Sequence, residues 1–406
     1  MFSSNPDNLA FAKFDGPRKQ GRGQMKIGMF TDCYLPTKNG VATSIAQLKE
    51  GLEQCGHQVL VFTVTSPRCE ERDLTIYRFP SFPFNSRLEL RAGLVSQRAV
   101  DRIVHAQQLD ILHTHTEFSL GWAAKRAARK LKIPLVHTAH TMYQDYRHYL
   151  WGKRWMSPKI IQWFFTRFFA NYDAIICPSQ KMRAYLSGFL PALKTVVIGN
   201  GVSKSRFSSY RSSSQACVRL RSSLKIGISD KVLLFVGRLA QEKRVLELLR
   251  ALAPLLQQHP HYKILFVGDG PLRQSIQFLA RKHSLSQQVI LAGYIPWKEM
   301  NNMYALADLF VTASLSEVHP MTLIEAIMCG LPIIARRDAS YVDLVQESYN
   351  GWLADTETQL AEQVAALLHD DAQRCTFSQH ALIIAENLTS EKYVERCEAL
   401  YQAVIR

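Results

Sequence analysis

Two glutamates, Glu317 and Glu325, lie eight positions apart beside an apolar run over residues 321–328. A run of this length that is followed by Gly330 and Pro332 predicts a short helix with a definite end. The free N–H groups and the positive dipole end at the start of such a helix suit a phosphate group. Carboxylates do not bind an anion, but they accept hydrogen bonds from hydroxyl groups beside it. The pattern therefore indicates a site for a nucleotide sugar, although ordinary surface glutamates on a helix give the same spacing.

A second segment supplies cations that can bind phosphate oxygens. Arg238 and Lys243 follow Gly237, which ends a β-branched run over residues 232–236. The planar fork of an arginine and the compact charge of a lysine both bind phosphate. Such a pair would stabilise a diphosphate as it leaves. Taken alone, the segment is equally typical of a solvated charged loop.

Several glycine-containing turns can bring backbone close to the same ligand. Residues 268–271 read Gly-Asp-Gly-Pro between an expected strand and an expected helix, although a plain tight turn gives the same letters. Gly40, in a loop rich in small residues, opens a helix and can approach the donor across a cleft. The candidate donor-binding residues in these turns and at the expected helix are Gly40, Gly237, Gly268, Asp269, Gly270, Met321, Thr322 and Glu325.

Five histidines lie near the ends of two expected strands, at residues 111–114 and 135–138. They are His113, His115, His137, His140 and His148. Ligands of α/β proteins bind at this edge of a sheet. The pairs His-x-His and His-x2-His can coordinate a metal, but a hard catalytic metal favours more carboxylates than this cluster offers. We therefore expect neither a metal ion nor a cofactor.

Short β-branched runs alternate with helical stretches in both halves of the chain, which predicts βαβ units and parallel sheets. The expected strands are residues 26–30, 59–64, 111–114, 135–138 and 174–177 in the first half, and 232–236, 263–267, 289–291, 309–312 and 332–335 in the second. Two such sets predict an α/β protein with two doubly wound, Rossmann-like domains that face a central cleft.

Composition narrows the class of protein. Hydrophobic content of 47% and charged content of 20% indicate a soluble globular chain rather than a disordered or fibrous one. The sequence has no run of about 20 apolar residues that could span a membrane and no apolar signal segment, so we expect a cytoplasmic location. Eight scattered cysteines without a CxxC pair predict reduced thiols and no zinc site.

The positive charge is concentrated in one half of the chain. Residues 1–200 carry 27 Lys and Arg against 14 Asp and Glu, whereas residues 201–406 carry 22 against 20. This asymmetry predicts a polyanionic partner, either nucleic acid or anionic lipid. The sequence contains no signature of a nucleic-acid-binding module, so we expect anionic lipid.

The order and spacing of Arg238, Lys243, residues 268–270, Glu317 and Glu325 resemble the retaining glycosyltransferases of family 4, which have the GT-B fold. The resemblance implies that the first glutamate contacts the hydroxyls of the donor sugar and the second those of the ribose. It also implies that the arginine and lysine bind the diphosphate, that the loop backbone at Ile295 meets the uracil, and that no metal is needed.

Position 320 departs from the family pattern, because Gly is the commoner residue there and this chain has Pro320. Proline has no N–H to offer a phosphate, although it is tolerated at a helix start. We therefore expect backbone contacts to the phosphate from Met321 and Thr322.

A longer stretch around the histidines is similar to the bacterial 1,2-diacylglycerol 3-glucosyltransferases, which make membrane glycolipids and lipoteichoic acid anchors. The similar segments run over residues 113–121 and 137–149. The resemblance implies that His140 lies beside the donor sugar and acts with Arg238, Lys243 and Glu317 in catalysis. It further implies that the acceptor side is lined by Tyr143, Asp145 and His148.

Residues 147–172 have the pattern of an interfacial amphipathic helix, in which basic residues accompany tryptophan and phenylalanine. The expected membrane-binding residues are Lys153, Arg154, Trp155, Lys159, Trp163 and Arg167. Each cation near an anionic leaflet contributes on the order of 1 kcal/mol. The stripe of Ile and Phe in the same stretch is also typical of a core helix.

These observations predict four segments. Residues 1–24 form a flexible extension, residues 25–200 a Rossmann-like domain for the acceptor and the membrane, and residues 201–385 a Rossmann-like donor domain. Residues 386–406 form a helix that, by the resemblance, crosses back to the first domain. The turn chemistry of Asn200 and Gly201 marks the join.

The combined expectation is an enzyme, peripheral on the inner face of a bacterial cell membrane, that moves glucose from UDP-glucose to the 3-hydroxyl of diacylglycerol with retention. Three other readings stay open: a galactosyl or second-sugar glycolipid transferase, an enzyme with a soluble sugar acceptor, and an inactive scaffold. Asp32 and Glu117 are weak candidates for a nucleophile of a double displacement.

Overall fold

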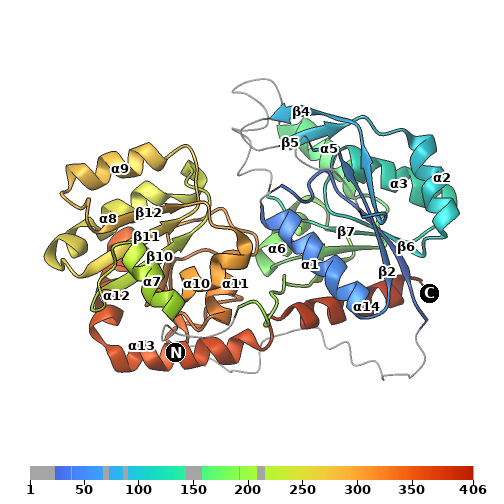
Figure 1. Cartoon of the computed structure of the whole chain (residues 1–406). Helices are drawn as coiled ribbons and strands as arrows, with labels where there is room; N and C mark the ends of the chain where they lie inside the picture. Colours follow the sequence, from blue (N-terminus) through green and yellow to red (C-terminus); the bar gives the residue numbers. More distant parts are fainter. Residues whose placement is uncertain are drawn as a thin grey trace.

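The computed structural model describes residues 23–37, 39–66, 73–85, 90–142, 158–191, 193–207 and 215–405. In this part of the chain, two parallel sheets are each flanked by helices and form two lobes that lie side by side (Figure 1). The expected α/β architecture with two doubly wound units is confirmed.

The first lobe is built on a seven-stranded sheet in the order β3-β2-β1-β6-β7-β8-β9. Its strands are β1 (Lys26–Phe30), β2 (Gln58–Val64), β3 (Ile76–Phe79), β6 (Ile111–Thr114), β7 (Leu135–Thr138), β8 (Ala174–Cys177) and β9 (Thr195–Val197). Its helices are α1 (Gly40–Gln54), α2 (Gln97–Gln107), α3 (Ser119–Leu131), α5 (Pro158–Phe169) and α6 (Gln180–Phe189), and a hairpin of β4 (Ser81–Asn85) and β5 (Leu90–Gly93) lies beside them. The central strands read as continuous apolar runs because helices cover both faces.

The second lobe has a six-stranded sheet in the order β12-β11-β10-β13-β14-β15. Its strands are β10 (Lys231–Val236), β11 (Tyr262–Val267), β12 (Val289–Gly293), β13 (Leu309–Thr312), β14 (Ile333–Arg336) and β15 (Gly351–Ala354). Its helices are α7 (Gln215–Ser223), α8 (Val245–Gln258), α9 (Arg273–Lys282), α10 (Met300–Ala305), α11 (Met321–Met328), α12 (Glu357–His369) and α13 (Asp371–Ala385), with short 3-10 turns at Gln241–Lys243 and Trp297–Glu299.

In both sheets the strand order reverses at the first strand, so that successive strands are added first on one side of it and then on the other. β1 pairs with β2 on one side and β6 on the other, and β10 pairs with β11 and β13 in the same way. The loops that leave the carboxyl ends of such strands diverge and leave a crevice, where α/β proteins bind ligands. In this chain the loops after β1, β10 and β13 carry many of the candidate residues.

The last helix, α14 (Ser390–Ile405), returns from the second lobe and packs against α1 of the first (Figure 1). Buried Tyr393, Val394 and Tyr401 join the core formed by β1, β2 and α1. The hydroxyl of Tyr401 lies 2.6 Å from Nδ1 of His113 on β6. The chain therefore passes between the lobes near Asn200 and again before α14.

Candidate functional site

A cleft of ≈ 1300 Å³ lies between the two lobes. It is lined by nearly all of the candidate catalytic and donor-binding residues that the structure describes: Gly40, His140, Gly237, Arg238, Lys243, Gly268, Asp269, Ile295, Glu317, Met321, Thr322 and Glu325. Gly270 is not among the lining residues. The sequence-based candidates Tyr143, Asp145, His148, Lys153, Arg154 and Trp155 lie outside the described residues.

Two helix starts face each other across this cleft. α11 begins after Pro320, whose carbonyl accepts hydrogen bonds from the amides of Leu323 and Ile324. The amides of Met321 and Thr322 precede those bonds, at the positive end of the helix dipole. A Cβ on Gly40, at the start of α1, would lie only 3.9 Å from the Met321 side chain. A phosphate between the two starts would meet two favourable dipoles.

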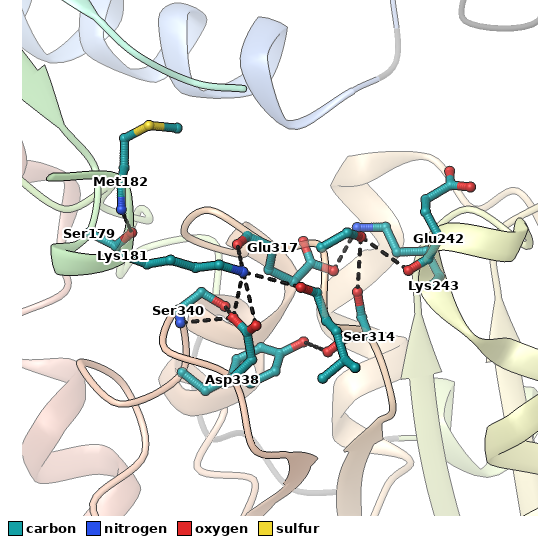
Figure 2. Close-up of polar contacts among 12 residues, drawn as sticks. Ser179, Lys181, Met182, Glu242, Lys243, Ser314, Glu317, Asp338 and Ser340 are labelled. Carbon is teal, nitrogen blue, oxygen red and sulfur yellow. Dashed lines mark hydrogen bonds and ion pairs between the residues drawn. The ribbon is translucent and has the colours of Figure 1, made fainter. Parts of the chain in front are cut away.

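Glu317 and Lys243 form an ion pair at the floor of the cleft, with 2.6 Å between Oε1 and Nζ (Figure 2). Their side chains are 16% and 19% exposed, so the pair is reachable from the cleft but largely shielded from water. Arg238, on the same loop as Lys243, has Nη1 4.0 Å from Oε1 of Glu242. Two cations and two carboxylates thus line the same cleft as the start of α11.

Glu325 lies on α11 and is almost fully buried at the edge of the cleft. Tyr304 donates a hydrogen bond of 2.6 Å to Oε2, and the indole of Trp297 donates one of 3.4 Å to Oε1. Burial nevertheless raises the pKa of Glu325 to about 7, because desolvation outweighs these two bonds. Sequence reasoning missed both aromatic partners.

The glycines after β10 and β11 allow two loops to pack backbone against backbone. A Cβ on Gly268 would lie 2.0 Å from the carbonyl oxygen of Gly237, and Gly268 has φ +126. A Cβ on Gly270 would lie 2.5 Å from the carbonyl oxygen of Leu239. Gly268 and Gly270 therefore serve the close approach of the two loops, in addition to any contact with a ligand.

The histidine cluster is held by hydrogen bonds among its members and their neighbours. His137, fully buried, lies 3.2 Å from Oε1 of Glu117 and 2.8 Å from the hydroxyl of Thr114. Nδ1 of His115 lies 3.1 Å from Nε2 of His140. Burial lowers the pKa of His140 to about 3, so this ring is neutral at pH 7 and can exchange hydrogen bonds with a sugar hydroxyl.

The two weak candidates for a nucleophile have structural tasks. Asp32 accepts hydrogen bonds from the amide of Leu120, at 3.2 Å, and from the hydroxyls of Thr116 and Ser119, so it caps the start of α3. Glu117 is buried beside His137. Within the described ranges, no group of three or more His, Cys, Asp or Glu side chains could hold a metal ion.

A buried polar chain joins the lobes next to the glutamates. The amide of Asn200 donates to Nδ1 of His319 at 3.2 Å, and its side-chain amide donates to the His319 carbonyl at 3.2 Å. Ser44 of α1 donates to Oδ1 of Asn200 at 3.0 Å. Burial lowers the pKa of His319 to about 4, which keeps Nδ1 free to accept. The sequence gives no local signal for this contact.

Helix α5 has two faces of different character. Phe168 and Phe169 are buried in the core of the first lobe, whereas Trp163 is 64% exposed and Arg167 also faces outward. Phe164 and Phe165 line the interlobe cleft. The core-helix interpretation is therefore confirmed for the face that carries Phe168 and Phe169, while membrane binding by the exposed face stays a prediction. In the part of the chain that the structure describes, no helix is long and apolar enough to cross a membrane.

A basic groove of ≈ 940 Å³ runs between α3 and α5. Its cationic lining consists of Lys125, Arg126, Arg129 and Arg167, and its aromatic lining includes Trp122 and Trp163. Desolvation, reinforced by neighbouring Arg167 and Arg129, lowers the pKa of Lys125 to about 8. The groove lies on the same face as the exposed side of α5.

Comparison with family models matches both lobes. The model described as Glycosyltransferase Family 4 matches residues 38–206, and the model described as Glycosyl transferases group 1 matches residues 219–382. Together the two matches include all twelve of the cleft residues named above.

Curated relatives match over nearly the whole chain. The sequence is 35% identical to the alpha-monoglucosyldiacylglycerol synthase of Streptococcus pneumoniae, over 89% of this chain and 83% of the relative. It is 30% identical to the enzyme of the same name from Acholeplasma laidlawii, over 94% of this chain and 98% of the relative. Among solved structures, the sucrose-phosphate synthase of Thermosynechococcus elongatus superposes with a TM-score of 0.76 at 20% identity, over 94% of this chain and 99% of that one.

Proposed function

Because the chain belongs to glycosyltransferase family 4 and has the GT-B fold, we propose that this glycosyltransferase moves glucose from UDP-glucose to the 3-hydroxyl of 1,2-diacylglycerol with retention. The observation that carries the proposal is the cluster of Glu317, Lys243 and Arg238 beside the start of α11, in a cleft whose other wall bears His140. The names of the two relatives above support the glucosyl group and the lipid acceptor.

The donor half of the proposal assigns each polar group a task. Arg238, Lys243 and the amides of Met321 and Thr322 bind the diphosphate of the donor. Glu325 accepts hydrogen bonds from the ribose hydroxyls, and Glu317 orients the sugar. The ion pair between Lys243 and Glu317 opens when a phosphate takes the lysine, which leaves the carboxylate free for sugar hydroxyls.

The acceptor half of the proposal rests on the apolar end of the cleft. Phe118, Trp122, Phe164 and Phe165 line this end, and the last two belong to α5, which also carries exposed Trp163. A diacylglycerol could pass from a membrane along α5 with its chains against these rings and its hydroxyl directed toward His140. The acceptor roles of Tyr143, Asp145 and His148 stay part of this proposal.

We infer a front-face displacement. The acceptor oxygen forms a bond to the anomeric carbon on the side from which the phosphate leaves, and the acceptor proton passes to a leaving phosphate oxygen. Arg238, Lys243 and the α11 dipole stabilise the charge that develops on UDP. Glu317 stabilises positive charge at the anomeric carbon. Asp32 and Glu117 are both engaged in buried hydrogen bonds, which argues against either as a covalent nucleophile.

No metal is needed in this scheme, because two cations and a helix dipole surround the diphosphate position. Excess EDTA should therefore leave the initial rate of sugar transfer unchanged within about twofold, as measured with enzyme purified in chelator. A rate that falls at least tenfold and returns with added Mg²⁺ or Mn²⁺ would contradict the metal-independent scheme.

The proposal is tested by offering the enzyme labelled UDP-glucose or UDP-galactose with diacylglycerol in vesicles, or with glycerol or free sugars as soluble acceptors. We expect a monoglucosyl lipid whose linkage is α by NMR. A galactosyl product, a product that grows only on a glycolipid, or transfer only to a soluble acceptor would each select one of the other readings.

A further inference from the structure

The ammonium group of Lys181, on α6 of the first lobe, makes its hydrogen bonds to residues of the second lobe. Its Nζ lies 2.7 and 2.9 Å from the two carboxylate oxygens of Asp338, and 3.1 Å from the carbonyl oxygens of both Leu315 and Glu317 (Figure 2). An ammonium group has three donors, so these four acceptors saturate it. All of them belong to the second lobe.

The Lys181 contact is shielded and well supported on both sides. The side chains of Lys181 and Asp338 are 14% and 13% exposed. Asp338 also accepts hydrogen bonds from the amide and hydroxyl of Ser340, at 2.9 and 2.6 Å, which fix its carboxylate. On the other side, Ser179 caps α6 through the amide of Met182. A shielded, multiply bonded pair of this kind differs from an exposed surface ion pair, which contributes little.

The segment that Lys181 contacts is the loop that carries Glu317. Three of its other anchors come from the second lobe: Tyr341 donates to the Ser314 carbonyl at 3.0 Å, Ser316 donates to the Glu242 carbonyl at 3.0 Å, and Lys243 holds the Glu317 carboxylate. Lys181 adds two backbone contacts, one of them to Glu317 itself. The carboxylate and the carbonyl of Glu317 are therefore held by lysines from different lobes.

A second residue of the first lobe, Asn200, binds the same loop at its C-terminal end. Asn200 binds both the ring and the carbonyl of His319, as described above. The loop from Leu315 to His319 is thus held at both ends by groups outside its own sheet. Such a loop takes its position from the relative placement of the lobes.

We propose that Lys181 is a positioning residue that couples the approach of the two lobes to the placement of Glu317. When the lobes close, Lys181 pulls the backbone at Leu315 and Glu317 into the arrangement in which the Glu317 carboxylate faces the donor sugar. When they separate, the loop loses two backbone hydrogen bonds and its charged anchor. This inference rests on the role proposed for Glu317 in sugar transfer.

The test uses the full chain with four changes: Lys181→Met, the double variant Lys181→Met/Asp338→Asn, Glu317→Gln, and Lys181→Met combined with Glu317→Gln. The double variant avoids a buried carboxylate without its cation. Lys204→Met is the matched control, since it removes a lysine from an exposed ion pair with Glu386. Three quantities are measured: amide hydrogen exchange of residues 314–319, the Kd of UDP by calorimetry, and kcat for sugar transfer.

We expect Lys181→Met and the double variant to speed exchange in residues 314–319 by about tenfold or more, because charged hydrogen bonds to the loop are lost. The kcat should fall by about 10- to 100-fold, since a small displacement of a positioned group is costly. The Kd of UDP should change less than about threefold, because Arg238, Lys243 and α11 are intact. In the Glu317→Gln background, Lys181→Met should change kcat less than about threefold.

Unchanged exchange in residues 314–319 would overturn the proposal, whatever the rates. Effects of Lys181→Met and Glu317→Gln that multiply, or a Kd of UDP that rises as much as kcat falls, would also overturn it, since Lys181 would then act on the protein at large. If the wild type transfers no sugar, the proposed function fails, while the exchange measurement still decides whether Lys181 orders the loop.

Discussion

At the scale of single residues, Glu325 in the donor half of the cleft has a strongly shifted ionisation. Its pKa of about 7 lies far above the ordinary value of a glutamate, because its burial outweighs the hydrogen bonds from Tyr304 and Trp297. Only the ionised form accepts hydrogen bonds through both oxygens. The folded protein holds this proton more tightly than the unfolded chain, so the contribution of Glu325 to stability declines as pH rises from about 4.5 to 7.

Binding of UDP-glucose should therefore strengthen as pH rises. About a tenth of Glu325 is ionised at pH 6 and about nine tenths at pH 8, so we expect the Kd to fall by about fivefold to tenfold over this range. In Glu325→Gln, whose side chain cannot ionise, the Kd of UDP-glucose should be high and should not change with pH. Calorimetry at constant ionic strength measures both. A wild-type Kd as level as that of the variant would contradict the role assigned to Glu325.

Some residues of the cleft could be predicted from the sequence and others could not. Arg238, Lys243, Glu317 and Glu325 could be predicted because they stand at fixed spacing next to strand ends and a helix start. Four other contacts of the site could not be predicted, because each comes from another element and no local pattern marks it. They are the contacts made by Tyr304, Trp297, Asn200 and Lys181. Such partners are determined by the packing of whole elements.

At the scale of elements, strands with both faces covered were the easiest to predict. β6, β8 and β13 are fully buried strands that begin with apolar residues, and the structure places them at the expected residues. β3 and β9 were missed because they are short edge strands whose residues are mostly only partly buried. Helix α11 was predicted at its observed bounds, since Pro320 and Gly330 delimit it.

The loops after β10 and β11 depend on a glycine at position 268. Gly268→Ala should lower the unfolding midpoint of the protein by about 5–10 °C, because its Cβ would collide with the Gly237 carbonyl in addition to adopting a positive φ. Gly56→Ala is the matched control, since Gly56 has φ +88 but no atom within 4 Å of an added Cβ. Its midpoint should fall by only about 2–4 °C. Differential scanning calorimetry compares the two, and equal shifts would exclude the clash.

At the scale of the whole molecule, charge and exposed aromatic groups gather on one side of the first lobe. Trp163 and Arg167 of α5 lie beside Arg126 and Arg129 of α3 around the basic groove. Together with the apolar end of the cleft, this arrangement agrees with the proposed docking of the first lobe on an anionic leaflet. Residues 143–157, which hold the expected membrane contacts Lys153, Arg154 and Trp155, lie outside the described residues.

Docking should depend on that face. Trp163→Ala combined with Arg167→Gln should weaken sedimentation with vesicles containing phosphatidylglycerol by about tenfold, since one interfacial aromatic and one cation are lost. Phe278→Ala is the control: Phe278 is 63% exposed, close to the 64% of Trp163, but lies on α9 of the second lobe. Equal binding by both variants would place the membrane contact elsewhere.

The central claim is that the cluster around Glu317 in the interlobe cleft carries out sugar transfer. The most direct measurement is the initial rate of glucosyl lipid formation from labelled UDP-glucose and diacylglycerol vesicles, for wild type, Glu317→Gln and Glu347→Gln. Glu347 also pairs with a basic side chain, Arg337, but its ion pair is exposed and lies outside the cleft. We predict that Glu317→Gln lowers the rate by about 100-fold or more and that Glu347→Gln leaves it within about twofold. Glucosyl lipid formed by Glu317→Gln at the wild-type rate would contradict the account.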